Sequence, residues 1–113
     1  MTTYREIYGL TLQEGGHSQV KGKRFMVGTP IEERVFSIDT FSPQDVKHYI
    51  EDVKEHIGKN TGVGTWVNEK DGNVYLDVST GFNDKNKAIA QAKEWNQLAI
   101  YDTVLNKTIH IKK

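Results

Sequence analysis

Residues 62–102 read GVGTWVNEKDGNVYLDVSTGFNDKNKAIAQAKEWNQLAIYD, and they hold most of the local signals in this chain. Apolar and polar residues alternate on both sides of Asp71-Gly72, a pair that favours the positive φ angles of a tight hairpin turn. Beyond the hairpin, Ala88 and Ala92 share one face of a helical pattern that begins near Asn83 or Asp84. The segment therefore predicts a strand, a tight turn, a second strand, a helix and a third strand.

A strand and a helix are predicted ahead of this segment, in residues 33–57. Ser42 is a natural N-cap, and Pro43 suits the first position of the helix that follows. Together with the hairpin segment, this gives residues 33–102 the predicted element order βαββαβ. This order is typical of a ferredoxin-like fold, in which one antiparallel sheet carries two helices on one face.

The flanking residues predict further strands at both ends of the chain. Apolar residues alternate in 4–12, a short apolar run occurs at 24–28, and Ile109 and Ile111 mark a strand in 107–112, whereas the polar, glycine-bearing residues 13–23 predict a loop. The alternation in the first of these segments rests on Tyr8, Leu10 and Leu12. We therefore expect residues 1–113 to form one α+β domain with a ferredoxin-like βαββαβ core and additional strands at both ends. A different α+β topology is the main alternative.

The composition excludes several classes of function. The 113 residues include 15 basic and 15 acidic side chains, and this balance disfavours a strong, non-specific nucleic-acid binder. The chain has no cysteine, which excludes disulfides and zinc–thiolate sites and fits a reducing cytoplasm. The N-terminus has no apolar core of signal-peptide length, and no apolar run approaches a membrane span, so we expect no membrane contact.

Three carboxylates at strand ends are the best candidates for chemistry. Asp39, Asp77 and Asp102 each occupy or follow the end of a predicted strand. If they converge, they suit a small ligand-binding protein or a metal-dependent enzyme. The competing interpretation, which we favour, is that they cap turns and aid solubility, so we assign no catalytic residue and no cofactor.

One helix face carries residues with metal-ligand spacing. His48, Asp52 and His56 follow one another at intervals of four in the first predicted helix. Two residues four positions apart could coordinate one metal ion across a single turn of the helix. Acidic residues surround this row as on any solvated helix face, and no second ligand cluster supports it. We assign no metal site.

The glycine-bearing loop carries three basic side chains, Lys21, Lys23 and Arg24. Residues 16–24 differ from a phosphate-binding P-loop, because five residues separate Gly16 from Gly22 and an arginine stands where a magnesium ligand is needed. Nucleotide binding is therefore not predicted. The three basic residues remain candidates for contact with a phosphate or an acidic partner as the loop becomes ordered.

Two aromatic residues are the strongest candidates for a contact surface. Trp66 and Tyr75 occupy the face of the predicted hairpin opposite to Val67, Leu76 and Val78. If helices cover the Val/Leu face, both rings point outward, as aromatic residues at interfaces do. The alternative is that residues 4–12 fold over that face and bury both rings. Stacking on RNA bases is disfavoured by the neutral charge and by the lack of an RNP signature.

Residues 64–102 contain G-x-W, V-Y-L-D-V-S and an N-Q-x-A-I-Y-D ending. In these motifs the second half of the chain resembles short uncharacterised proteins carried by phages and other mobile elements. That group has no established catalytic residues to transfer. The resemblance implies an accessory protein that acts in the cytoplasm of a host cell by binding a host or phage protein, including inhibition of a host defence complex.

The leading hypothesis is therefore a non-enzymatic protein-binding module of phage or mobile-element origin. An exposed strand edge beside an apolar face also invites a symmetric homodimer. The alternatives are a small ligand-binding protein or enzyme that uses the strand-end aspartates, and a virion or assembly component.

Overall fold

The longest strand, β5 (Asn73–Phe82), organises the sheet in this computed structural model, which describes residues 3–111. On one side, β5 pairs along most of its length with β4 (Thr61–Asn68). On the other side, two short strands share it. The first half of β5 pairs with β3 (Arg34–Ser37), and the second half pairs with β2 (Phe25–Gly28).

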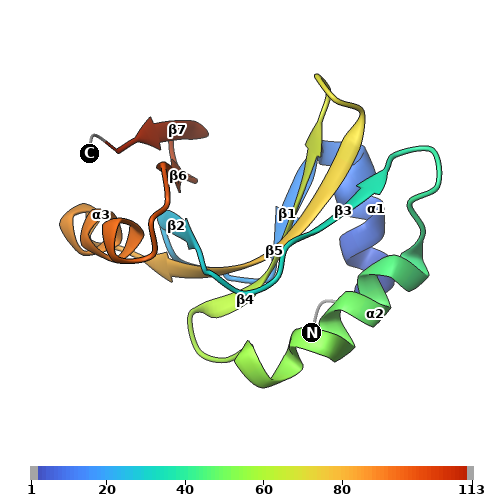
Figure 1. Cartoon of the computed structure of the whole chain (residues 1–113), viewed down its shortest axis with the longest axis horizontal. Coiled ribbons are helices and arrows are strands. Elements are labelled where there is room, and N and C mark those ends of the chain that lie inside the picture. The colour runs from blue at the N-terminus through green and yellow to red at the C-terminus, as the bar shows by residue number, and fades with distance from the viewer. Residues whose placement is uncertain (1–2, 112–113) are drawn as a thin grey trace.

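Three further strands extend the sheet at its two edges. β1 (Gly16–Ser18) pairs with β4, while β6 (Ala99–Asp102) pairs with β2 and in turn with β7 (Lys107–His110). Within residues 3–111 the order is β1-β4-β5-β2-β6-β7, with β3 beside β5, and every neighbouring pair is antiparallel. In Figure 1 the β6–β7 pair and the turn of the β4–β5 hairpin lie far apart, at opposite sides of the view.

Three α-helices in the described residues cover one face of this sheet. They are α1 (Tyr4–Glu14), α2 (Pro43–Val53) and α3 (Lys85–Glu94), and a short 3-10 helix, η1 (Lys54–His56), continues α2. None of the helices in this range is long and apolar enough to cross a membrane.

The core lies between the helices and alternate residues of β5. Val74, Leu76 and Val78 are fully buried against side chains of α1 and α2, among them Ile7 and Tyr49. Further along the same face of β5, Phe82 packs into a second cluster with Phe25, Val27, Ile100 and the small residues Ala88 and Ala92 of α3. Since side chains alternate between the two faces of a strand, the three helices lie on one face, and no helix of residues 3–111 covers the other face.

The structure confirms an α+β domain, and the predicted order of elements in residues 33–102 is observed as β3, α2, β4, β5, α3 and β6. The sheet is not a simple four-stranded ferredoxin-like sheet, because β6 pairs with β2, which lies outside this segment.

Leu76 is buried as predicted. Ser42 caps α2 as predicted, and its N–H donates to Asp45 Oδ2 at 2.9 Å.

The predicted N-terminal strand at residues 4–12 is wrong, because these residues form most of helix α1. Thr3 caps this helix by accepting a hydrogen bond from the Glu6 N–H, and Gly15 ends it in the left-handed conformation at φ 82°. Ile7 and Thr11, four residues apart, are its fully buried positions. The spacing that buries this segment is therefore helical, and the apparent alternation is incidental.

The connection from β1 to β2 crosses the helix-free face of the sheet. We call residues 19–24 the crossing segment. A Cβ atom on Gly62 would lie 2.9 Å from Gln19 Cβ, and one on Gly81 would lie 2.6 Å from Lys23 Cβ. Glycines at these two positions therefore allow the crossing segment to lie directly on β4 and β5.

Candidate binding site on the open face of the sheet

Three apolar side chains form a row across the helix-free face, which we call the open face. Trp66 of β4 and Val35 of β3 are both register partners of Tyr75, the residue between them on β5. The Trp66 and Tyr75 rings lie 5.4 Å apart between centroids, and the Tyr75 hydroxyl donates a hydrogen bond to Asp71. Trp66 is 55% exposed and Val35 is 47% exposed. We call these three residues the apolar row.

The outward orientation of Trp66 and Tyr75 confirms the prediction from alternation along the hairpin. The alternative, in which residues 4–12 cover both rings, is wrong, because these residues form α1 on the opposite face of the sheet. Large exposed apolar side chains in contact with one another are typical of surfaces that bind another molecule.

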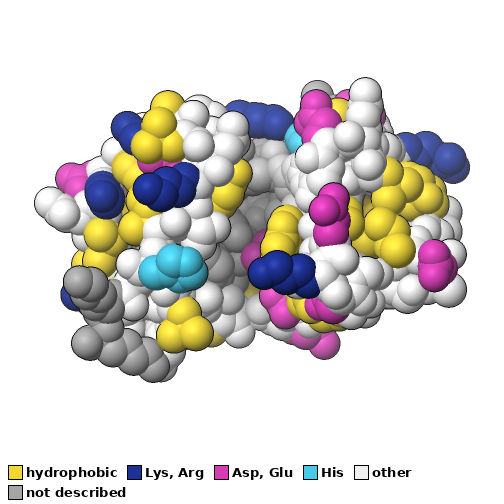
Figure 2. Space-filling model, turned by 90° about the horizontal axis from the view of Figure 1, so that it is seen from above, with side chains coloured by type: hydrophobic (Ala, Val, Ile, Leu, Met, Phe, Trp, Pro, Cys, Tyr) yellow, Lys and Arg dark blue, Asp and Glu magenta, His cyan; other side chains and the backbone are white. Residues whose placement is uncertain are grey.

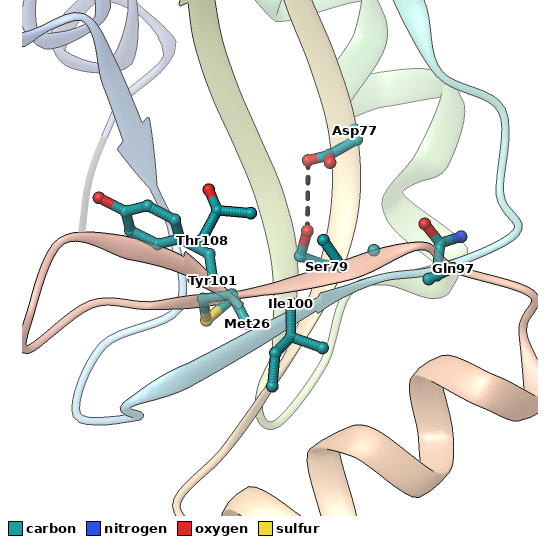
Figure 3. Close-up of a pocket in the computed structure, with 9 residues that line it drawn as sticks. Met26, Asp77, Ser79, Gln97, Ile100, Tyr101 and Thr108 are labelled. Atoms are coloured by element: carbon teal, nitrogen blue, oxygen red, sulfur yellow. Dashed lines mark hydrogen bonds between the residues drawn. The ribbon is translucent and has the colours of Figure 1, made fainter. Parts of the chain in front are cut away.

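A cleft opens on the same face beyond the apolar row. It has a volume of about 240 Å³, and we call it the Asp77 cleft; its walls are Met26, Gly28, Asp77, Ser79, Gln97, Ala99, Ile100, Tyr101 and Thr108. In Figure 2 the surface is hollowed between two lobes, one with β6 and β7 and one with the β4–β5 hairpin. Figure 3 shows Asp77, Ser79, Tyr101 and Thr108 on one side of the sheet, whereas Ile100 points to the other side.

A missing side chain on one side of β5 and an interruption of the strand pairing on the other side create room for the Asp77 carboxylate. Gly64 is its register partner on β4, and a Cβ atom there would lie 2.8 Å from Asp77 Oδ1. On the other side of β5, the pairing is interrupted where residues 29–33 connect β2 to β3. Asp77 therefore occupies a gap in the sheet surface that larger neighbours would fill.

The electrostatics of the cleft are unusual for a carboxylate. Burial raises the pKa of Asp77 to about 6, the hydrogen bond from Ser79 Oγ at 3.3 Å opposes this rise, and the negative charge of Glu33 adds to it. None of the described residues that line the cleft is basic, and Asp77 makes no ion pair within residues 3–111. A half-buried carboxylate without a cationic partner is unusual, because removing the charge from water is costly.

The three strand-end aspartates do not converge. Asp39 is exposed in the turn after β3, near the hairpin end of β5, whereas Asp102 ends β6 beside Phe25, at the other end of the sheet. Asp102 is buried and accepts two hydrogen bonds from Arg24, at 3.0 Å from Nε and 2.8 Å from Nη2. It also caps the turn after β6 by accepting from two backbone N–H groups, and together these bonds lower its pKa to about 2.

The three basic candidates have different environments. Arg24 is occupied by its ion pair with Asp102, and its guanidinium lies 5.0 Å from the centroid of the Phe25 ring. Lys23 is half-buried, with its stem packed over Gly81, and Lys21 is exposed on the crossing segment. They follow one another along the chain, and of the three only Arg24 lines the shallow cleft beside Phe25 and Asp102.

The helix face with metal-ligand spacing is tied into the protein's own ion pairs. Asp52 Oδ2 lies 2.7 Å from Arg34 Nη2, and His48 is exposed beside it on α2. His56 lies in η1, beyond the end of α2. In the part of the chain that the structure describes, no group of three or more histidine, aspartate or glutamate side chains is placed to hold a metal ion.

No family model, curated protein or solved structure matches this chain.

Proposed function

We propose that this protein is a non-enzymatic protein-binding module that contacts its partner through the open face of its sheet. The apolar row carries this proposal, because Trp66 and Val35 are exposed on either side of the half-buried Tyr75, so that the row extends across three strands. Tryptophan and tyrosine supply much of the binding energy at protein interfaces, since they bring large contact areas at low entropic cost.

The resemblance of residues 64–102 to phage and mobile-element proteins supports a partner inside a host cell. Within that setting, we propose that binding inhibits a host protein complex such as a defence system. The small size of the domain suits this role, because inhibition by occlusion needs a contact surface and no catalytic group.

Affinity capture with matched variants tests the proposal. The tagged full-length chain, its Trp66→Ala variant and its Leu98→Ala variant are incubated with lysate of candidate hosts, and the captured proteins are identified by mass spectrometry. Leu98 is 65% exposed and lies outside the apolar row, so it is a matched control for loss of an exposed apolar side chain. We expect a protein captured by the wild type and by Leu98→Ala but not by Trp66→Ala.

Two other outcomes would contradict this form of the proposal. Equal capture by all three chains would show that the apolar row is not part of the interface. If instead the partner is a second copy of the chain, sedimentation velocity will show a concentration-dependent dimer that Trp66→Ala dissociates, and the host protein would no longer be needed.

A further inference from the structure

The Asp77 carboxylate lacks the cation that such a group ordinarily has. It is partly removed from water, it accepts one hydrogen bond from Ser79, and the like charge of Glu33 also acts on it. The sheet nevertheless keeps space above it, through Gly64 on one side and Gly28 on the other. A carboxylate that is both desolvated and left facing open space is suited to pairing with a charge from outside the chain.

We propose that the Asp77 cleft receives the cationic end of a lysine or arginine side chain from the protein partner. This inference rests on the proposed function, and it adds the chemistry by which that partner is recognised. Lysine and arginine carry only hydrogen-bond donors at their ends, so they suit a cleft whose polar lining offers acceptors.

Two acceptor oxygens converge above Gly28. The position where a Cβ atom on this residue would stand lies 3.5 Å from Gln97 Oε1 and 3.9 Å from Asp77 Oδ2. The Asp77 and Gln97 side chains come from β5 and from the connection between α3 and β6, so the fold brings together two oxygens that are distant in the sequence. Ser79 and Thr108 add hydroxyl groups to the same cleft.

The apolar part of the lining fits the stem of such a side chain. Met26 and the ring of Tyr101 belong to the β2–β6 wall of the cleft, where the two residues are register partners. Methylene groups of lysine or arginine pack on surfaces of this kind while the charged end reaches a polar group. An aromatic ring near a cation adds a further attraction.

The cleft is close enough to the apolar row for one partner to use both. Tyr75 and Asp77 are two residues apart on the same face of β5, which corresponds to about 7 Å along the strand. A partner that covers Trp66 and Tyr75 also excludes water from the cleft entrance, and this strengthens an ion pair inside it. The two features therefore form one recognition surface with an apolar part and an acidic part.

A metal ion is a weaker candidate than an organic cation. A single carboxylate lines the cleft, and no group of three potential ligands is found among residues 3–111. Hard cations such as Ca²⁺ and Mg²⁺ are held by several oxygen ligands, often more than one of them a carboxylate.

The first test uses a probe of the cation alone. The full-length chain is titrated at neutral pH with n-butylammonium chloride and, in parallel, with the neutral analogue n-butanol, while NMR follows the Met26 methyl group and the amides of β2 and β5. We expect saturable shifts with n-butylammonium only. Asp77→Asn should weaken this binding by about tenfold or more, since it removes one partner of a desolvated charge pair. Asp39→Asn is the matched control, because Asp39 is exposed and distant from the cleft.

Equal responses to the ammonium and to n-butanol, or n-butylammonium binding that Asp77→Asn leaves unchanged, would overturn the inference. Trp66→Ala should leave n-butylammonium binding intact, so this test is independent of the apolar row.

The second test uses the captured partner. Asp77→Asn should reduce capture of the same protein that Trp66→Ala loses. If Trp66→Ala abolishes capture and Asp77→Asn does not, the proposed function stands and the assignment of the cation to the partner is overturned.

Discussion

The two faces of β5 come from alternate residues of one strand, yet their environments are opposite. Val74, Leu76 and Val78 point toward the helices and are fully buried in an apolar cluster. Tyr75, Asp77 and Ser79 point away and form the apolar row and the cleft. The helix-covered face is an apolar core, whereas the open face of β5 carries a carboxylate and a half-buried aromatic ring that stability alone does not require. This contrast is what locates the binding surface.

Leu76→Ala should cause the largest effect. It deletes methyl groups at the centre of the helix-covered face and leaves a cavity, so we expect a loss of about 2–5 kcal/mol in the free energy of unfolding. Urea denaturation followed by circular dichroism measures it. An unchanged urea denaturation midpoint would mean that this face of β5 is not the core. The two faces of the strand would then not differ in the way described above.

Gly81→Ala tests the part of the open face that the crossing segment covers. A Cβ atom there would stand 2.6 Å from Lys23 Cβ and 2.8 Å from Val20 Cγ1, so the crossing segment must shift. Overpacking of this kind costs about 1–3 kcal/mol. Gly58→Ala is the control, because nothing lies within 4 Å of its Cβ position, and we expect a change within about 0.5 kcal/mol. Equal denaturation midpoints for the two variants would contradict the close contact.

Asp77→Asn should stabilise the protein at neutral pH by about 3 kcal/mol, a value that follows from the size of the pKa shift. The pKa of Asp77 is raised from 3.8 to about 6 by burial, so the folded state favours the protonated side chain. The stability gained from this proton is complete below the ordinary pKa and is lost as the pH rises through about 6. Asparagine imitates the protonated form without titrating.

Denaturation of the wild type and of Asp77→Asn at a series of pH values measures this effect. The two proteins should be about equally stable at acid pH and diverge as the pH rises toward neutrality. If the wild type is instead the more stable protein at neutral pH, the Asp77 carboxylate already has a favourable partner within the chain. Its charge would then not be available to a cation from outside.

Trp66→Ala should have the smallest effect on stability. Its ring packs on Tyr75 across the strands but is 55% exposed, so we expect a loss of about 0.5 kcal/mol, within the range of cross-strand pairs. A thermal melt with unchanged cooperativity is the measurement. A loss as large as that of Leu76→Ala would show that the apolar row is structural.

The elements with strong local signals were predictable from the sequence. Ser42 and Pro43 mark the start of α2, and Asp71-Gly72 lies in the turn of the hairpin, because caps and tight turns are determined by a few adjacent residues. Helix α1 was missed although Thr3 and Gly15 delimit it, since the alternation in residues 4–12 outweighed these caps. The order of strands was also beyond local patterns, because nothing in β2 or β3 indicates that both pair with β5.

The candidate site was predictable only in part. The alternation in the hairpin placed Trp66 and Tyr75 on the outer face, and both lie there. The sequence marks Asp77 only as one of three strand-end carboxylates. The cleft around it depends on Gly28, Gly64 and Gln97, which come from separate elements, and on the interruption between β2 and β3. These relations exist only in the folded chain.

The pairing of β2 with β6 has a consequence for folding kinetics. The β4–β5 hairpin closes over a short turn, whereas the contact between Arg24 and Asp102 spans 78 residues of sequence. Local contacts form early and long loops close late, so we expect the hairpin to belong to the folding nucleus and the β6–β7 end to dock last. Native-state hydrogen exchange should show the same ranking, with the amides of β6 and β7 opening at lower free energy than those of β4 and β5. One wall of the Asp77 cleft would then be the least stable unit of the sheet, and its local opening would control how fast a partner's side chain enters.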